Sequence, residues 1–486
     1  MNTEMLDNSG QDLSRAAANG MKTPRGLRAR GVLLGLCACL FGGAGCVSFD
    51  AAEARRGQTE AFTNELARLE EEWLARPLSL GECVAIAMTN NYEVRKADLD
   101  AQLGRFSRDM AFSAFLPQVS ASATRVDYDR DPVLNSQRFT SGGVDVGMAV
   151  LMPSTWFLYD EARHGRAAAD LAAGYVRQGV ALQTTAAFYE VLVQEKLVAA
   201  AERQLAAARE TSGRVEGLAR EGFARPWERD QARYLVEARE AQLGAARRAL
   251  DVKRGDLLRA MGLSPLAGIS LVPPEEEDFP PPEPLEELVL RALECNPRLP
   301  IADRQVVMKE SAVRRAFCEF LPNLAVFGQW SFTGNKVMNP PSHNFDWGFK
   351  GTWDLFNGFR SVADVRAAKA ERRQTELARE NTFLSVMAGV VSARAAVEDA
   401  AAGAAVARRA WEVASGKAED LMARAKEGLE PVSDALDAEA ARDAAEAEML
   451  RASYTERVAR ANLDFAVGEG NIENIENRCA DIEREE

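Results

Sequence analysis

Hydrophobic and polar residues alternate strictly along 345–355, and the same period of two recurs along 323–333. Because alternation places successive side chains on opposite faces, both stretches are predicted to be β-strands with one apolar and one polar face. In the first half of the chain, 142–152 alternates in the same way, and 118–128 alternates weakly with small residues. About ten residues is the length of a tilted strand that crosses a bilayer, although half-buried strands of a soluble sandwich give the same period.

Two very long helical patterns follow these strands. No proline interrupts the chain between Pro153 and Gly222, or between Asn357 and Gly428. A continuous helix of that length would reach roughly 100 Å. At each end a glycine, which readily ends a helix, precedes a proline suited to the first turn of the next helix. We therefore predict two helical hairpins with tips near 222 and 428; two soluble coiled-coil arms would give the same pattern.

The chain contains an internal duplication, which indicates two structurally equivalent halves. The first repeat is expected at 77–262 and the second at 285–467, joined by a proline-rich linker at 263–284 and followed by an acidic tail at 468–486. Six residues recur with an offset of 205 positions: Leu80, Glu82, Asn91, Phe115, Leu116 and Pro117 return as Leu285, Glu287, Asn296, Phe320, Leu321 and Pro322.

The N-terminus has the composition of a secretory signal peptide, expected at 1–45 with an upstream extension before Met21. Basic residues precede a short apolar run and a group of small residues, and Cys46 follows directly. This arrangement resembles the lipobox of bacterial lipoproteins, which implies that Cys46 is acylated. An ordinary signal peptide cleaved nearby is the alternative. Residues 46–76 are then a lipid-anchored helical extension.

Composition argues against several classes of function. With 59 basic and 73 acidic residues the net charge is −14, and because no basic stripe is present, we expect no nucleic-acid partner. The seven cysteines show no CxxC spacing, which predicts no metal site. His164 and His343 are the two histidines, and no catalytic set or phosphate-binding glycine motif accompanies them. We therefore expect no enzymatic activity and no cofactor.

Four strands per chain raise a problem of closure. A sheet inside a membrane must close so that no backbone edge faces lipid, and the smallest known barrels have about eight strands. One chain therefore cannot close a barrel alone. The sequence predicts an α+β membrane protein in which at least two copies, with three favoured, complete the sheet.

These features resemble the TolC-like outer-membrane efflux family. The resemblance covers 77–467 and rests on Leu78-Ser79-Leu80 with Asn90-Asn91, on the two Phe-Leu-Pro sites, on 355–360 (Leu-Phe-Asn-Gly-Phe-Arg) and on the two tips. It implies a homotrimer with one twelve-stranded barrel and a long helical barrel through the periplasm. It also implies a periplasmic adaptor, an inner-membrane pump and passive export of drugs or metals across the outer membrane of a Gram-negative bacterium.

In this family the hairpin tips contact the adaptor and form the closing aperture. The resemblance carries that role to Gly222, Phe223, Gly428, Leu429 and Asp434, and it offers Glu419 and Asp420 as acidic aperture residues. A solvated helix face is the alternative for the last two. Trp227 and several arginines distinguish the first tip from the family's usual pattern.

Two rival functions stay open at this point. The first is a lipid-anchored periplasmic scaffold or adhesin, in which the sheet is a soluble sandwich. The second is a hydrolytic envelope enzyme, against which the missing catalytic set argues.

Overall fold

The computed structural model describes residues 51–130, 137–223, 225–274, 280–334, 343–427, 429–430 and 432–469. The chain divides into one unit up to Glu65 and a second from Leu66 onward. In the first unit the described residues form the start of helix α2 (Ala51–Trp73). The expected signal peptide, Cys46, Gly428 and most of the acidic tail lie outside the described residues.

In the second unit, the same series of elements occurs twice. Equivalent elements begin 205 to 207 residues apart, as 285 − 80, 323 − 118, 432 − 226 and 360 − 153 show. The first series is α3 (Leu80–Asn90), α4 (Tyr92–Ser113), β1 (Gln118–Asp127), β2 (Arg138–Leu151), α5 (Pro153–Arg220) and α6 (Pro226–Ala260). The second is α7 (Leu285–Cys295), α8 (Arg298–Cys318), β3 (Asn323–Thr333), β4 (His343–Thr352), α9 (Arg360–Lys426) and α10 (Val432–Val467).

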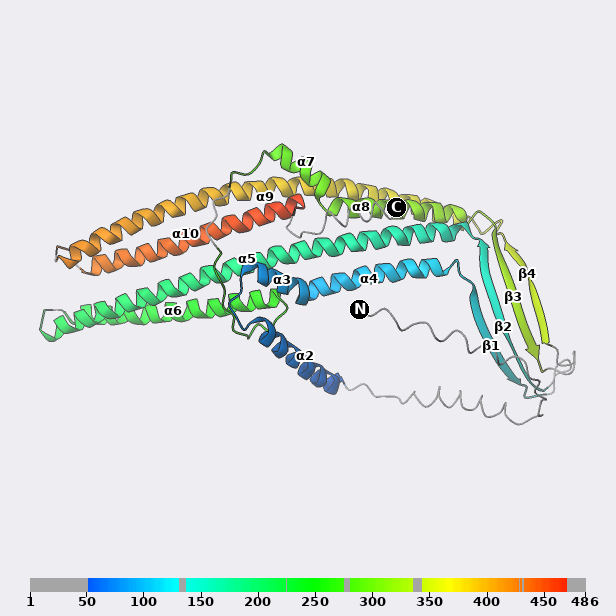
Figure 1. Cartoon of the computed structure of the whole chain (residues 1–486), viewed down its shortest axis with the longest axis horizontal. Helices are drawn as coiled ribbons and strands as arrows, with labels where there is room; N and C mark the ends of the chain where they lie inside the picture. Colours follow the sequence, from blue (N-terminus) through cyan, green and yellow to red (C-terminus); the bar gives the residue numbers. More distant parts are fainter. Residues whose placement is uncertain are drawn as a thin grey trace, which may run out of the picture. The chain divides into compact units, whose positions relative to one another are not determined.

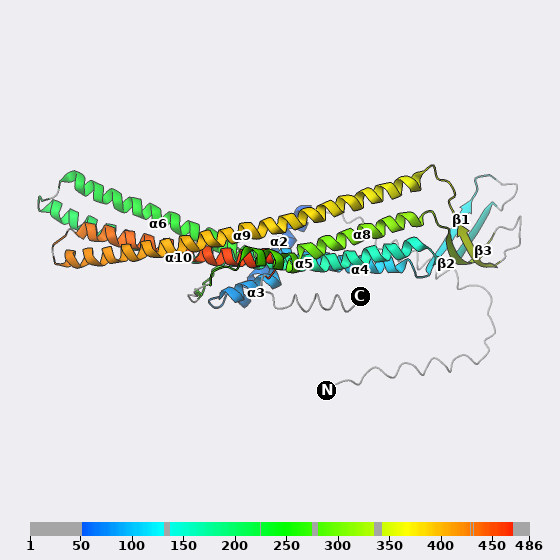
Figure 2. The ribbon, with the colours of Figure 1, turned by 90° about the horizontal axis from the view of Figure 1, so that it is seen from above.

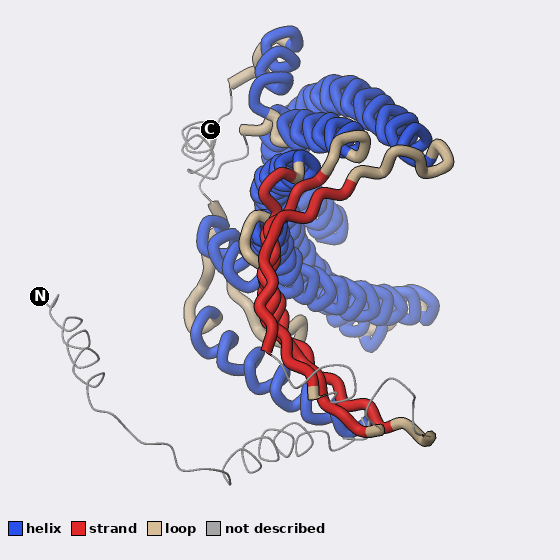
Figure 3. The backbone as a smooth tube through the Cα atoms, turned by 90° about the vertical axis from the view of Figure 1, so that its right-hand side faces the viewer, coloured by secondary structure: helices blue, strands red, loops and turns tan. Residues whose placement is uncertain are grey.

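The four strands form one antiparallel sheet in the order β1-β2-β3-β4 (Figure 1). The register places Val144 beside Trp330, and Trp330 beside Phe345, so the apolar residues of neighbouring strands share one face. Asp145 and Gln329 are opposite each other on the other face, which is polar. Figure 3 views the unit from the side of the sheet and shows the strands in front of the helices.

Two strand boundaries differ from the sequence-based expectation. β2 begins at Arg138 rather than near 142, because its pairing with β1 continues as far as Asp127. β4 covers His343–Thr352 rather than 345–355. The alternation misleads at Trp353, whose indole Nε1 donates a hydrogen bond to the Phe320 carbonyl oxygen (3.1 Å) instead of continuing the strand.

The long helices have the length that the absence of proline indicated. α5 contains 68 residues and α9 contains 67, which corresponds to roughly 100 Å each. α6 returns along α5 and α10 returns along α9, and both hairpins turn at the end away from the sheet (Figures 1 and 2). None of the described helices combines the length and the apolar composition needed to cross a membrane.

The hydrophobic core lies where the short helices meet the hairpins. Phe188, Leu257 and Met261 are fully buried in its largest cluster, and Val390 and Val397 are fully buried in the second. The second cluster belongs to α7, α8, α9 and α10. The first also receives residues of the second repeat, the partly buried Leu450 and Val458 and one buried residue. That residue is Tyr454 of α10, whose ring stacks on Tyr189 of α5 at a centroid distance of 5.0 Å.

Each repeat closes through a buried asparagine between its two short helices. Asn91 accepts hydrogen bonds from the backbone N–H groups of Glu93 (2.7 Å) and Val94 (3.3 Å), and its Nδ2 donates to the Ala260 carbonyl (2.7 Å). It thereby caps α4 and holds the end of α6.

The second repeat has the same closure. Asn296 Oδ1 accepts from the Arg298 N–H (3.0 Å), and its Nδ2 donates to the Ala466 carbonyl at the end of α10 (2.8 Å). Gly262 and Gly468 follow the two held helix ends with φ of +72° and +100°. We call each set of contacts the asparagine closure of its repeat.

Candidate functional site

The sheet exposes an apolar surface that a water-soluble protein would bury. Phe345, Trp347 and Phe349 of β4 lie on one face, and Trp347 keeps 71% of its surface exposed. Among the described residues, no helix packs extensively on either face of the sheet. Exposed apolar patches of this extent mark a surface for protein or membrane. The opposite face carries Ser120, Ser122, Thr124, Ser141, Asp145, Gln329, Ser331, Asn344, Asp346 and Lys350.

The sheet is also open at both edges. β1 pairs only with β2, and β4 pairs only with β3, in the part of the chain that the structure describes. Each edge therefore presents a row of backbone N–H and C=O groups that could pair with another strand. In lipid such groups must be paired, so an edge-to-edge contact with another chain would complete the sheet.

The helices next to the sheet form a layer with exposed apolar residues at both sides. α4 packs on α5, α5 on α8 and α8 on α9, so α4 and α9 are the outer helices. Leu99, Leu103, Phe106 and Met110 occur on α4 at helical spacing and are exposed. On α9, Leu377, Leu384 and Val391 occur every seven residues and are also exposed. The sequence contains this regular spacing of apolar residues, but the sequence-based predictions did not include it.

The first hairpin tip ends in a glycine turn. Gly222 has φ of +81° with open space around it, and Phe223, whose N–H donates to the Leu218 carbonyl (2.8 Å), is 80% exposed. Trp227 and Tyr234 on α6 are exposed as well. The structure therefore places an apolar and aromatic surface at the first tip.

The second tip has the same backbone bond and a different surface. The Leu429 N–H donates to the Arg424 carbonyl (2.9 Å), and the Leu429 side chain is exposed. Glu419, Asp420 and Asp434 are exposed around it, and Asp420 forms an ion pair with Arg424 (3.0 Å). Since Asp420 pairs one helical turn along α9, its geometry is also that of a solvated helix face.

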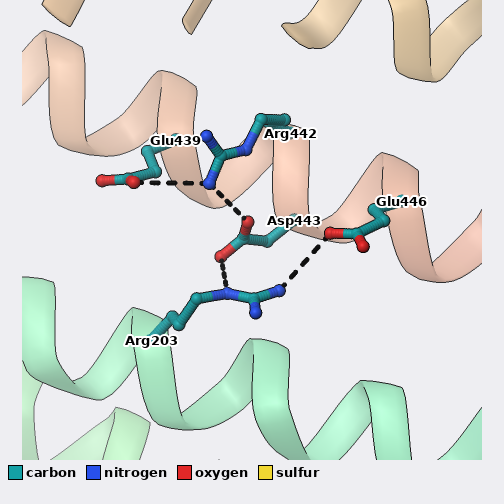
Figure 4. Close-up of polar contacts among 5 residues, drawn as sticks. All are labelled: Arg203, Glu439, Arg442, Asp443 and Glu446. Atoms are coloured by element: carbon teal, nitrogen blue, oxygen red, sulfur yellow. Dashed lines mark hydrogen bonds and ion pairs between the residues drawn. The ribbon is translucent and has the colours of Figure 1, made fainter.

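A buried charge links the two hairpins. Asp443 on α10 is 1% exposed, and its carboxylate accepts from Nε of Arg203 on α5 (2.6 Å) and from Arg442 (3.0 Å) (Figure 4). Arg203 also approaches Glu446 (3.5 Å), and Arg442 approaches Glu439 (3.3 Å). The neighbouring carboxylates raise the pKa of Arg442, and the hydrogen bond that Arg442 donates to Asp443 has the largest effect. The sequence alone did not point to this cluster.

The two histidines lie in different surroundings. His164 on α5 lies 3.5 Å from Asp160 and 3.1 Å from Arg304 of α8, so it lies in a polar seam between the repeats. His343 begins β4, and its ring stacks on Trp330. Among the residues that the structure describes, no group of His, Cys, Asp or Glu has metal-site geometry.

Comparison with known proteins gives similarities at the levels of sequence and fold. Residues 288–469 match the family model of outer membrane efflux proteins. The fold is similar to that of the Campylobacter jejuni CmeC outer membrane channel (TM-score 0.70, 18% identity, 84% of this chain and 89% of that chain). It is also similar to the open state of the Neisseria gonorrhoeae MtrE outer membrane channel (TM-score 0.63, 20% identity, 80% and 89%) and to the Vibrio cholerae outer membrane protein VceC (TM-score 0.63, 14% identity, 80% and 96%). No curated protein matches the chain.

Proposed function

We propose that the chain is a member of the outer membrane efflux protein family, whose model matches residues 288–469, and that it forms a passive export channel across the outer membrane and the periplasm. The observation that carries the proposal is the sheet. It has an exposed apolar face, a polar face and two open edges, and it continues into helices of roughly 100 Å. In lipid, the apolar face contacts acyl chains and the polar face lines a water-filled passage.

Three copies complete the sheet in this proposal. Four strands from each copy give twelve, with β1 of one chain paired to β4 of the next. The same association buries the exposed stripe of α4, Leu99, Leu103, Phe106 and Met110, against α9 of the neighbouring copy. Sheet edges and outer helices thus require the same partner, which supports a homotrimer.

The tips at Gly222, Phe223, Gly428, Leu429 and Asp434 dock a periplasmic adaptor, which connects the channel to an inner-membrane pump for drugs or metals. Exposed apolar residues at the ends of both hairpins support this assignment. Acylation of Cys46 anchors the chain to the outer membrane. Glu419 and Asp420 remain candidates for an acidic aperture.

A periplasmic scaffold or adhesin is the second candidate, and the exposed face of the sheet opposes it. Trp347 and Phe349 would face water in a soluble sheet with no covering layer.

The test of the channel is reconstitution of the full chain into planar bilayers. We expect stepwise single-channel conductance and a trimer that resists detergent until it is heated. A monomer that stays in solution without detergent and gives no conductance would overturn the proposal.

Docking at the tips is tested by cross-linking to a periplasmic adaptor protein from the same bacterium. Phe223→Asp and Leu429→Asp are each expected to lower cross-linking several-fold, because a charge replaces an apolar contact. Leu266→Asp is the matched control, since Leu266 is 93% exposed and lies outside both hairpins. Equal cross-linking in all three variants would refute the tip assignment.

A further inference from the structure

The apolar face of the sheet ends in charged residues at the end where β1 leads to β2. Arg125 and Asp127 continue the odd-numbered positions of β1 that include Val119, so they lie on the apolar face. On β2, Thr140 is opposite Arg125 and Arg138 is opposite Asp127, which places both on the same face. This is the end of the sheet away from the helices.

A hollow of about 480 Å³ lies among these residues. Gly334 lines it without a side chain, and Gly142 lies on the same face under one of the lining residues. The Phe332 ring leans over Gly142, at 2.8 Å from where a Cβ would be, and the Gly334 N–H donates to the Thr140 carbonyl (2.9 Å). The lining residues are Arg125, Arg138, Phe139, Thr140, Phe332, Thr333, Gly334 and His343.

Among the described residues, the lining of the hollow carries more positive than negative charge. Asp127 is the carboxylate that contacts both guanidinium groups, and it does so through Nε of Arg125 (3.3 Å) and Nε of Arg138 (3.6 Å). Both arginines are largely exposed, and each guanidinium has five N–H donors, so one carboxylate cannot occupy them all. The His343 ring is held by its stack on Trp330, at a centroid distance of 5.5 Å and an angle of 9°.

Two arginines, a threonine hydroxyl and an imidazole around one hollow are groups that bind phosphate. The neighbouring surface on the same face is apolar and aromatic, with Phe345 next along β4. A ligand that fits both parts has a phosphorylated headgroup attached to hydrocarbon chains.

We propose that this hollow binds the phosphorylated headgroup of a glycolipid in the outer leaflet of the outer membrane. The inference rests on the proposed function, because the helices then lie in the periplasm and the hollow lies at the outer leaflet. The acyl chains of the lipid run along the apolar face toward the helices. The lipid thereby fixes the depth of the sheet in the bilayer.

The experiment measures lipid binding to the detergent-purified full chain by native mass spectrometry, with diphosphoryl lipid A as the probe. The wild-type chain should retain the lipid, and Arg125→Gln with Arg138→Gln should weaken binding by roughly tenfold per arginine. Monophosphoryl lipid A should bind the wild-type chain less tightly than the diphosphoryl form. Arg360→Gln is the control, since Arg360 is an exposed arginine at the helix end of the sheet.

Three results would overturn the inference. These are unchanged binding by the double variant, equal loss with Arg360→Gln, and equally tight binding of phosphatidylglycerol or inorganic phosphate. The double variant must remain a trimer, which its detergent-resistant migration reports. Conductance of the wild-type chain is recorded separately. Conductance with arginine-independent binding refutes only the lipid site, whereas arginine-dependent binding without conductance refutes only the channel.

Discussion

The two repeats share their closures and differ at their tips. In each repeat an asparagine between two short helices holds the end of the return helix, through Ala260 in the first and Ala466 in the second. At the tips, the first hairpin exposes Phe223 and Trp227, whereas the second exposes Leu429 among carboxylates. The parts that build the fold are thus the same in both halves, while the surfaces offered to a partner are different.

This difference indicates which parts of the duplicated unit tolerate a change of side chain and which do not. A closure must satisfy buried polar groups, and few side chains do so in a given backbone geometry. A tip faces solvent in the chain alone, so packing within the chain does not restrict its side chains. If the tips dock an adaptor as proposed, they offer it two different surfaces. The comparison can be tested at the closures first.

The largest effect is expected at the glycines of the closures. A Cβ on Gly262 would lie 2.4 Å from the Asn90 carbonyl oxygen, and one on Gly468 would lie 2.7 Å from the Cys295 carbonyl oxygen, both at positive φ. Gly262→Ala and Gly468→Ala should each lower the free energy of unfolding by about 3 kcal/mol. Denaturant unfolding followed by circular dichroism measures this.

Gly222→Ala is the matched control for these variants. Its φ is also positive, but no atom lies within 4 Å of the added Cβ, so a loss of about 1 kcal/mol is expected. If only one of Gly262→Ala and Gly468→Ala lowered the free energy of unfolding, the two closures would not be equivalent.

The asparagines should give the next largest effect. Asn91→Ala removes the acceptor of two N–H groups at the start of α4, of which the Val94 bond is long (3.3 Å), and Asn296→Ala removes the acceptor of one at the start of α8. Each variant also leaves a carbonyl without its donor. A loss of about 2 kcal/mol is expected in each case. Asn90→Ala is the control, because the buried Nδ2 of Asn90 has no hydrogen-bond partner among the described residues. Unequal losses at 91 and 296 in the same unfolding assay would contradict the comparison.

The ion pairs of Asp443 between the two repeats are expected to contribute somewhat less to the free energy of unfolding than the asparagine closures. Asp443→Ala leaves Arg442 and the half-exposed Arg203 without their shared carboxylate, so the free energy of unfolding should fall by about 1–2 kcal/mol. Glu446→Ala removes a more exposed partner of Arg203 and should change it by less than about 0.5 kcal/mol. Thermal unfolding of the two variants side by side measures the difference. Equal losses of stability in the two variants would show that burial of Asp443 does not strengthen its ion pairs with Arg203 and Arg442.

Much of the fold could be predicted because local patterns carry it. The family resemblance is confirmed, and the absence of proline indicated the length of α5 and α9. The end of β4 could not be predicted, since Trp353 bonds to the distant Phe320 carbonyl. Asp443 was missed for the same reason: in sequence it is one carboxylate among many on a helix, and only its burial against Arg203 distinguishes it.

The asparagine closures lie between these cases. The repeat of Asn91 as Asn296 was visible in the sequence, but the carbonyls of Ala260 and Ala466 that they bind were not. A repeated polar residue marks a constrained position, and the structure is needed to supply its partner. The roles of the tips could not be decided from the sequence or from the structure of one chain. Phe223 and Leu429 are exposed, which fits docking, and an experiment with a partner is needed to test it.

The smallest effect concerns the start of each repeat, where the two differ. Ser79 and Glu82 form a reciprocal cap on α3, whereas α7 begins after Pro284 with no side-chain cap. The hydrogen bonds from the Ser79 backbone and hydroxyl lower the pKa of Glu82, with a smaller contribution from Arg76. Because the folded state favours the carboxylate, its stabilising contribution is present at neutral pH and is lost as the pH falls through the lowered pKa. Glu82→Gln should therefore flatten the fall of stability with acid below about pH 5, whereas Glu287→Gln should leave it unchanged. Melting temperatures measured across that pH range test this prediction. If both variants flattened the dependence of stability on pH, the cap on α3 would not be the cause of that dependence.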